Sequence, residues 1–163
     1  MFPGMNVILA TTLTYRTIDP VADADFAINA YLDACRASYG NDGTFPGRAR
    51  HLAWLRARVE EFPDGHVVAL LDGCPVGQME LQVPYGLPTG YVNLYYVAPE
   101  LRGLGFARRM HDDYAVRYFR SWEARTVQLH VSGQNERAMG FYRSLGYRAV
   151  RREGRLWLME RRL

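Results

Sequence analysis

The spacing of hydrophobic positions changes several times along this chain, and each change marks an expected element. Apolar and polar residues alternate over residues 12–18, which predicts a strand with one buried face. Apolar residues then recur every three or four positions over residues 23–39 and 48–62, a spacing typical of amphipathic helices. Residues 66–71 and 76–83 are apolar runs on either side of an Asp-Gly-Cys-Pro segment, so we expect a β-hairpin there.

The second half of the chain continues with shorter helices between strands. The expected strands are 91–97, 126–131, 147–150 and 155–159, and the expected helices are 105–121 and 135–145, the last ended by Gly146. The order β-α-α-β-β-β-α-β-α-β-β predicts an α/β fold. We expect a mixed, mostly antiparallel, twisted sheet of about seven strands flanked by four helices.

Composition narrows the class of protein. The 163 residues suffice for one domain, 1–163, in which residues 1–11 are expected to form a loose N-terminal segment. No run approaches membrane-spanning length and no signal segment is evident, so the cytoplasm is the expected location and no membrane partner is expected. Cys35 and Cys74 lack the spacing of a zinc site, which favours reduced thiols and no metal.

The basic residues are all arginine, 20 in number, and the net charge is +3. The absence of lysine excludes a lysine Schiff base and a P-loop lysine. The modest charge fits a phosphate-bearing ligand. It is weak evidence for nucleic acid, because the arginines are not interleaved with stacking aromatics, so no nucleic-acid partner is expected.

The segment from Val97 to Arg108 carries the first chemical motif. An apolar strand runs into a turn rich in Pro and Gly, and an amphipathic helix begins directly afterwards. Such a turn presents free backbone N–H groups at the positive end of a helix, and Gly103 and Gly105 let a ligand approach the backbone. Arg102 and Arg108 add positive charge, so the segment predicts an anion-binding loop.

Two well-known phosphate-binding motifs do not match this segment. The dinucleotide fingerprint needs a small residue where Arg108 stands, and an acid about twenty residues further on a strand. No glycine-lysine pair is present for a Walker A loop. A turn without any ligand remains the alternative when this segment is considered alone.

A second motif lies downstream, with Asn135, Tyr142 and Gly146 at fixed spacing. Taken with Arg102, Gly105 and Ala107, it resembles the GNAT superfamily of acyl-CoA-dependent N-acyltransferases. The motifs cover roughly residues 66 to 150, and the order of elements extends the resemblance to the whole chain.

The resemblance implies a coenzyme A site and a GNAT-like fold. The backbone of residues 103–108 would bind the pyrophosphate of acetyl-CoA, the co-substrate. A bulge would splay strand four from strand five, so that main-chain groups of strand four pair with the pantetheine arm, and the N–H of Val97 would polarise the thioester carbonyl. The implied cofactor-binding residues are Tyr95, Tyr96, Val97, Arg102, Gly103, Leu104, Gly105, Phe106, Ala107, Arg108 and Asn135.

The resemblance also assigns catalytic roles. Tyr142 would protonate the departing thiolate, although a helix tyrosine after a phenylalanine also fits a packing role. Family members carry a glutamate base on strand four or five. Asn93, which cannot titrate, stands at the first place and His130 at the second. His130 alternates with the apolar positions of its strand and is therefore the candidate base, against the alternative of a surface histidine. Glu80 and Tyr95, acting through water, are further candidates.

The expected activity is transfer of an acetyl group to a primary amine by direct attack. The acceptor slot in this family would be built from residues 38–50, 82–90 and 148–155, which include Tyr39, Phe45 and Tyr85. Because acidic residues are sparse there, a small-molecule amine or a peptide N-terminus fits better than an aminoglycoside. A non-catalytic acyl-CoA sensor is the alternative, and a homodimer is left open.

Overall fold

The computed structural model describes residues 12–43 and 45–163, so the expected loose segment 1–11 lies outside the described residues. The strands are β1 Leu13–Thr17, β2 His66–Leu71, β3 Cys74–Gln82, β4 Thr89–Val97, β5 Thr126–Ser132, β6 Arg148–Glu153 and β7 Leu156–Arg162. The helices are α2 Ala24–Tyr39, α3 Arg48–Glu61, α4 Phe106–Met110, α5 Val116–Ser121 and α6 Glu136–Ser144, with a 3-10 turn η1 Pro99–Leu101 and a π-helical turn η2 His111–Ala115.

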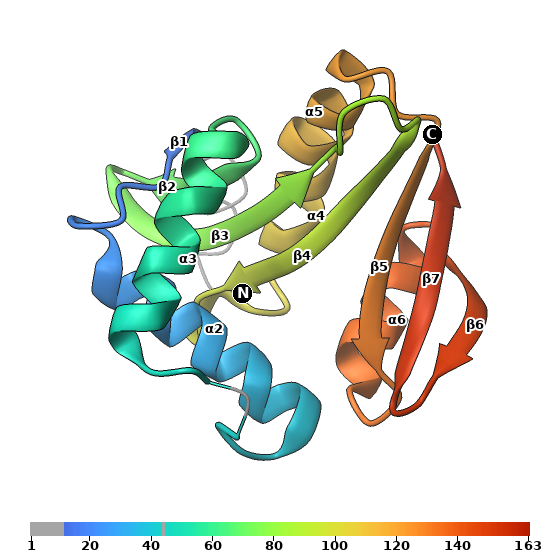
Figure 1. Ribbon diagram of the computed structural model, residues 1–163, viewed down its shortest axis with the longest axis horizontal. Helices are drawn as coiled ribbons and strands as arrows, with labels where there is room; N and C mark the ends of the chain where they lie inside the picture. Colours follow the sequence, from blue (N-terminus) through green and yellow to red (C-terminus); the bar gives the residue numbers. More distant parts are fainter. Residues whose placement is uncertain (1–11, 44) are drawn as a thin grey trace, which may run out of the picture.

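The seven strands of the described residues form one sheet in the order β1-β2-β3-β4-β5-β7-β6. All neighbours pair antiparallel except β4 and β5, which run parallel (Figure 1). The expected α/β class, with a mixed and mostly antiparallel sheet flanked by helices, is confirmed.

Helices cover both faces of the sheet and divide the core into layers. The larger cluster packs one face against α4, α5 and α6, with Phe106, Phe119 and Met139 among its buried members. Two smaller clusters join the other face to α2 and α3. The two smaller clusters include apolar residues that the helical spacing predicted to be buried: Ala30 of α2 and Leu55 of α3 are both fully buried there. The helical periodicity alone therefore identified which sides of α2 and α3 meet the sheet.

The pairing of β4 with its neighbours breaks at one residue. Glu80 of β3 lies opposite Leu94 and the next residue, Leu81, lies opposite Val92, so Asn93 is an extra residue in β4. This is a β-bulge, which bends the strand and leaves its extra residue unpaired. The parallel pairing of β4 with β5 ends at the same level, with Val92 opposite Leu129. Beyond that rung the two strands diverge, and the expected splay between strands four and five is confirmed (Figure 1).

Two local features differ from expectation. The hairpin between β2 and β3 turns on Asp72 and Gly73 alone, both with positive φ, so β3 begins at Cys74 rather than at Val76. The expected helix 105–121 is continuous but contains the π-helical turn at His111–Ala115. The inserted residue places the buried Met110 and Ala115 five positions apart, whereas the expected stripe continued at four through Tyr114.

None of the helices in the described part of the chain has the length and apolar character needed to cross a membrane.

Candidate active site

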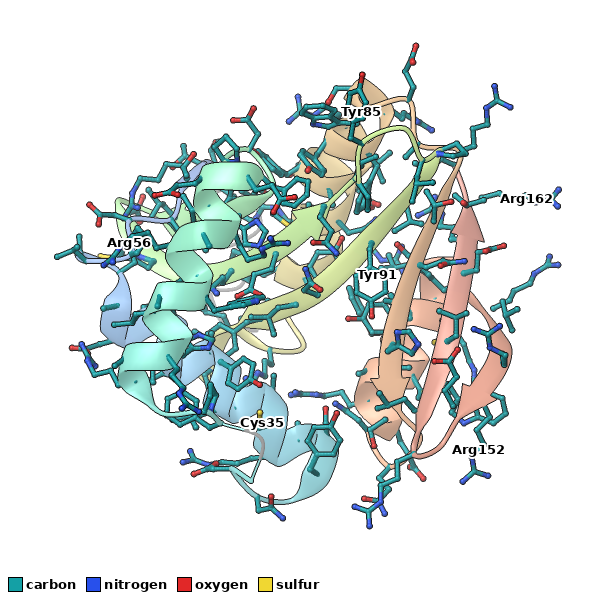
Figure 2. All side chains as sticks on the ribbon, viewed as in Figure 1. Cys35, Arg56, Tyr85, Tyr91, Arg152 and Arg162 are labelled. Atoms are coloured by element: carbon teal, nitrogen blue, oxygen red, sulfur yellow. The ribbon has the colours of Figure 1, made fainter. Side chains whose placement is uncertain are left out.

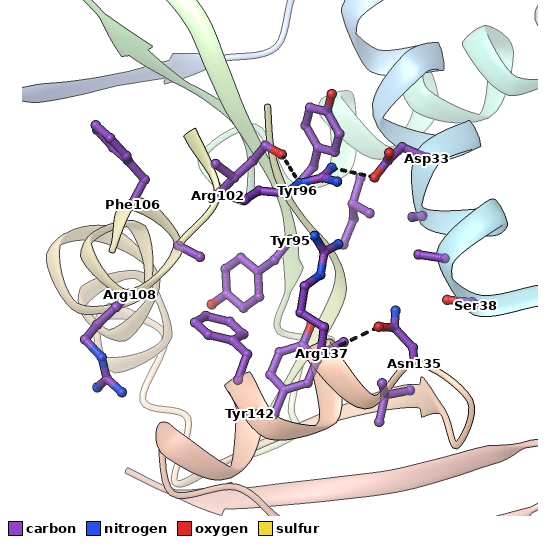
Figure 3. Close-up of a pocket in the computed structure, with 18 of the residues that line it drawn as sticks. Asp33, Ser38, Tyr95, Tyr96, Arg102, Phe106, Arg108, Asn135, Arg137 and Tyr142 are labelled. Atoms are coloured by element: carbon purple, nitrogen blue, oxygen red, sulfur yellow. Dashed lines mark hydrogen bonds and ion pairs between the residues drawn. The ribbon is translucent and has the colours of Figure 1, made fainter. Parts of the chain in front are cut away.

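A cleft of about 400 Å³ opens where β4 and β5 diverge. Its walls come from β4, from the loop after β4, from the start of α4, from β5 and from α6, and the last two turns of α2 close the remaining side (Figure 3). The volume lies within the range of small-molecule sites. Most of the residues expected from sequence line this one cleft: Tyr95, Tyr96, Val97, Arg102, Gly103, Gly105, Phe106, Ala107, Arg108, His130, Asn135 and Tyr142.

The loop after β4 has the backbone of an anion-binding turn. Gly103 has a φ of 77° and Gly105 a φ of 83°, a left-handed conformation that side chains other than glycine rarely adopt. A Cβ at either glycine would meet no atom within 4 Å, so open space lies beside the turn. In the described residues, no backbone hydrogen bond is donated by the N–H groups of residues 103–108. A diphosphate fits this arrangement, because it supplies the missing acceptors.

The two arginines of the loop hold it in place. Arg102 donates from Nε to the carbonyl oxygen of Val97 at 2.9 Å and from Nη2 to Asp33 Oδ2 of α2 at 2.6 Å (Figure 3). Arg108 donates to the carbonyl and hydroxyl oxygens of Ser144, at the end of α6. Both guanidinium groups therefore tie the loop to its neighbours, in addition to the charge that they add to the cleft.

The main chain of β4 is turned toward the gap at alternate residues. Ala98 donates its N–H to Val76 of β3, so in an antiparallel ladder Val97 lies at a rung without β3 hydrogen bonds. The N–H groups of Val97 and, two residues earlier, Tyr95 therefore point away from β3 toward the side where β5 has separated. An amide-rich chain lying along the gap would find these groups available.

Tyr142 reaches the cleft from α6 as one of several packed aromatic rings. Its side chain is 9% exposed, and its ring centroid lies 6.2 Å from that of Tyr95 and 5.7 Å from that of Tyr147. Burial raises the pKa of Tyr142 well above its ordinary value, with smaller contributions from Tyr147 and Tyr91. The phenol thus keeps its proton over the whole physiological range and is available as a hydrogen-bond or proton donor.

Asn135 and Arg137 occupy the start of α6. Asn135 is the N-cap, since its Oδ1 accepts from the N–H of Ala138 at 3.1 Å, and it lines the cleft as well. The capping role and the cofactor-contact role are therefore geometrically compatible. Arg137 extends into the cleft in Figure 3, and within the described residues no hydrogen bond or ion pair is recorded for its guanidinium group. Arg137 is a positively charged residue of the cleft that neither sequence motif includes.

His130 lies at the apex of the gap, one residue beyond the last paired rung of β5. Its Nδ1 lies 2.6 Å from the hydroxyl oxygen of Tyr91 of β4, and its Nε2 lies 2.9 Å from Oε2 of Glu153 of β6. Both ring nitrogens are thus engaged by side chains from the two neighbouring parts of the sheet. The sequence identified His130 but neither of its partners.

Several other candidates from the sequence lie elsewhere. Leu104 is absent from the residues lining the cleft. Glu80 is buried beneath the α2 side of the sheet, where Gln78 donates to it at 2.8 Å, and it does not reach the cleft. Tyr85 is fully exposed near the end of α5, away from the cleft (Figure 2), and Phe45 packs on Tyr31 and His51.

The α2 wall of the cleft was missed by sequence reasoning. Asp33, Ala34, Ala37 and Ser38 face the gap. Three of the four are small residues three or four positions apart, which is a signal of close approach by another chain or ligand. Of these four residues, only Ser38 falls within the expected acceptor segment 38–50.

The comparisons with known proteins agree with the geometry. A family model described as the acetyltransferase (GNAT) family matches residues 28–147. This match covers more than half of the chain, and the chain therefore belongs to the GNAT acetyltransferase family. Among curated proteins, none matches the sequence closely enough to be reported as a relative.

Solved structures share the fold at low sequence identity. PaiA N-acetyltransferase from Thermoplasma acidophilum, solved with coenzyme A, superposes with a TM-score of 0.73 at 16% identity, covering 93% of this chain and 99% of that one. YncA from Salmonella typhimurium, a putative acetyltransferase solved with acetyl-CoA, gives 0.69 at 22% identity over 94% and 95% of the two chains. Spermidine N-acetyltransferase from Vibrio cholerae, solved with CoA and spermine, gives 0.69 at 21% identity over 92% and 95%.

Proposed function

We propose that this protein is an N-acetyltransferase that moves the acetyl group of acetyl-CoA to a primary amine by direct attack. The observation that carries the proposal is the gap between β4 and β5, which has a glycine turn with unused N–H groups at its open end and His130 at its apex. A diphosphate held at the turn would direct an attached thioester along β4 toward the apex.

Residues 103–108 would bind the diphosphate of the substrate, and Arg137 would add a positive charge beside it. The N–H groups of Tyr95 and Val97 would hold the arm and polarise the thioester carbonyl, as oxyanion donors do. These groups are preorganised by the sheet, so no reorganisation is needed when charge develops on the oxygen. Acetyl-CoA itself supplies the activated acyl group.

The transfer needs one proton removed and one delivered. As the amine nitrogen bonds to the carbonyl carbon, the carbon–sulfur bond breaks and Tyr142 donates a proton to the sulfur. The amine loses a proton toward His130, directly or through a neighbour. Because Tyr142 has a raised pKa, its main contribution would be a hydrogen bond that strengthens as negative charge grows on sulfur.

The acceptor would approach from the α2 side of the sheet, where His130 faces. A small-molecule amine or a peptide N-terminus fits this opening. Structural neighbours include an enzyme named for spermidine and a ribosomal-protein-alanine N-acetyltransferase from Brucella melitensis, so both kinds of amine deserve a place in the assay.

The test is thiol release from acetyl-CoA, measured with spermidine and with a short peptide that begins with alanine. We expect release above the hydrolysis background with at least one amine, together with an acetylated product in the mass spectrum. Binding of CoA without amine-dependent turnover, over a broad amine panel, would instead favour an acyl-CoA sensor. Absence of CoA binding in calorimetry would overturn the proposal.

A further inference from the structure

The hairpin between β6 and β7 carries a cluster of exposed arginines outside the cleft. These hairpin arginines are Arg148, Arg151 and Arg152 of β6 and Arg155 of the turn that follows. Charge is unevenly distributed along the chain, since residues 126–163 contain eight arginines and three acidic residues, whereas residues 1–125 contain twelve and fourteen. The part of the sheet that begins with β5 is therefore positive, and the hairpin arginines lie at its edge.

Most of the charge of the hairpin arginines is not neutralised by neighbouring acids. In the described residues, only Arg151 of the four forms an ion pair, with Glu153. Arg152 donates from Nε to a carbonyl oxygen of its own hairpin at 3.1 Å, and its Nη groups have no recorded partner there. For the guanidinium groups of Arg148 and Arg155, the described part of the chain supplies no recorded hydrogen bond or ion pair. Three guanidinium groups are thus available to an anionic partner.

Two of the hairpin arginines line a second hollow of the molecule. It measures about 330 Å³ and is lined by Gly133, Gln134, Arg152, Arg155 and Trp157. The N–H of Gly133 donates to the carbonyl oxygen of Arg155 at 3.1 Å, which fixes the loop after β5 against the hairpin. Among the described residues, this lining contains two guanidinium groups and no carboxylate. The hollow therefore fits a carboxylate ligand, which arginine binds through paired N–H groups.

The hollow lies a short distance from the cleft. Val131 lines the cleft and lies opposite Trp157 of β7, and Trp157 in turn lies opposite Arg152 of β6. Neighbouring strands are about 4.8 Å apart, so two strand spacings, or about 10 Å, separate the two sites. An extended polypeptide advances about 3.3 Å per residue, and about three residues therefore span that distance. A small amine at the apex is too short to reach the hairpin.

We propose that the hairpin arginines, with Arg152 and Arg155 at their centre, form a second site that binds acidic side chains of a polypeptide acceptor. This inference rests on the proposed acetyltransferase function and specifies its substrate class. The acceptor is a peptide N-terminus followed by Asp or Glu at about the third to fifth position. Its amine occupies the apex of the gap while its carboxylates contact the hairpin. Polyamines are disfavoured, because the hairpin repels their positive charge.

Two other occupants of the hairpin fit less well. A peptide added as a further strand would need an unbroken row of main-chain groups, but the pairing of β6 shifts at Val150, between Ala149 and Arg151. A bulge together with charged side chains is typical of an edge strand that does not accept another strand. A single-stranded nucleic acid would need exposed aromatic faces for stacking. Trp157 is the one aromatic residue that lines the hollow in the described part of the chain, and it packs against the core.

The first test measures binding without turnover. The probe is a labelled peptide that begins with Ala-Ala-Asp-Glu-Asp, and the reference peptide has Asn and Gln in place of the acids. We expect fluorescence anisotropy in the presence of CoA to show about fivefold tighter binding of the acidic peptide, because two exposed arginine–carboxylate pairs supply about that factor. The difference should vanish at high salt, where the charges are screened. Equal Kd values for the two peptides at low salt would overturn the proposal.

Variants locate this preference on the hairpin. The double substitution Arg152→Gln and Arg155→Gln should abolish the preference for the acidic peptide. Arg56→Gln is the matched control, because Arg56 is an exposed arginine of α3 on the opposite side of the molecule (Figure 2). It should retain the full preference. Equal losses in the double variant and in Arg56→Gln would show that overall charge, and not the hairpin, determines binding.

The second test uses turnover to measure the reach of the site. We compare alanine peptides with the acidic triplet at the third to fifth positions or moved five residues further along. The first should have a lower KM and an equal kcat, since these contacts lie away from the reacting atoms. Equal KM values would overturn the proposal. An oligonucleotide of the same net charge should compete poorly for the labelled peptide, and competition as strong as that of the unlabelled acidic peptide would contradict the assignment to a polypeptide.

The failures are distinguishable. If the wild type shows no turnover with any amine but binds the acidic peptide through Arg152 and Arg155, the acetyltransferase proposal fails and the second site stands. If the wild type acetylates spermidine or the neutral peptide as efficiently as the acidic one, the second site is wrong and the acetyltransferase proposal stands. Circular dichroism checks that each variant folds. Should the double variant not fold, Arg152→Gln and Arg155→Gln as single substitutions should each lose part of the preference.

Discussion

Arg102 and Asp33 join the loop after β4 to the middle of α2 by a 2.6 Å ion pair, although 69 residues separate them. Both side chains are at least two-thirds buried, and the same guanidinium group also donates to Val97. The turn after β4, which we propose to bind the diphosphate, is therefore anchored to the helix that forms the opposite wall of the cleft. This ion pair fixes the position of the loop relative to α2, and with it the width of the cleft.

Loss of that link should weaken CoA binding. In Asp33→Asn, Arg102 loses its charged partner and the loop its anchor, so we expect the Kd for CoA to rise by up to about tenfold, equivalent to about 1.4 kcal/mol. Isothermal titration calorimetry measures the change. Asp42→Asn is the control. Asp42 also forms a 2.6 Å ion pair with an arginine, Arg36 of α2, but both of these side chains are exposed. Equal effects of both substitutions would show that the loop does not depend on Asp33.

Removal of the Tyr142 hydroxyl should affect turnover far more than binding. We expect Tyr142→Phe to lower kcat by roughly a hundredfold and to change the Kd for CoA less than about twofold, because the proton or hydrogen bond is needed only as the thiolate leaves. Steady-state thiol release gives the first value and calorimetry the second. Tyr147→Phe removes a neighbouring buried hydroxyl outside the cleft and should retain activity. An unchanged kcat in Tyr142→Phe would remove it as the acid.

Glycine at position 105 is required by its backbone conformation. Gly105→Ala places a Cβ at a φ of 83°, which costs about 1–2 kcal/mol. The turn should relax away from this conformation, and CoA affinity should fall with it. Urea unfolding and calorimetry report the two effects. Gly140→Ala is the control within α6, where a Cβ meets no atom within 4 Å. It should raise stability by about 0.5–1 kcal/mol.

Glu80 should make stability depend on pH. Burial raises the pKa of Glu80 to about 7 in the folded protein, against an ordinary value of 4.5. Between these values the folded state binds more protons than the unfolded state, so this group makes the protein less stable as the pH rises. Above pH 7 the full penalty, on the order of 3 kcal/mol, applies.

Glu80→Gln removes that penalty and keeps an oxygen for Gln78. We expect the variant to match the wild type near pH 4.5 and to gain stability progressively up to about pH 8, measured by urea unfolding. His66 lies opposite Glu80 in the sheet, and burial lowers its pKa to about 4, which acts in the opposite direction between pH 4 and 6.5. Because His66 is present in both proteins, the difference between them isolates Glu80. Glu60→Gln, on the exposed side of α3, should show no such trend.

The local elements and the glycine turn after β4 were accessible from the sequence. Alternation along β1 and helical spacing along α2 depend only on neighbours in the chain. The turn at Gly103 and Gly105 was identified because only glycine suits a strand-to-helix turn that approaches a ligand closely. The π-helical turn at His111–Ala115 was not, since Tyr114 continues the four-residue apolar spacing across it although Ala115 is the buried residue.

By itself, the sequence determined the order of elements, the glycine turn and the candidacy of Tyr142 and His130. Only the tertiary structure decided what surrounds them. Tyr91 and Glu153 lie 39 and 23 residues from His130, and they reach it through the register of β4, β5, β7 and β6. Register arises from the packing of whole strands and from the bulge at Asn93. A local pattern carries neither of these, whereas the side-chain contacts of His130 depend on both.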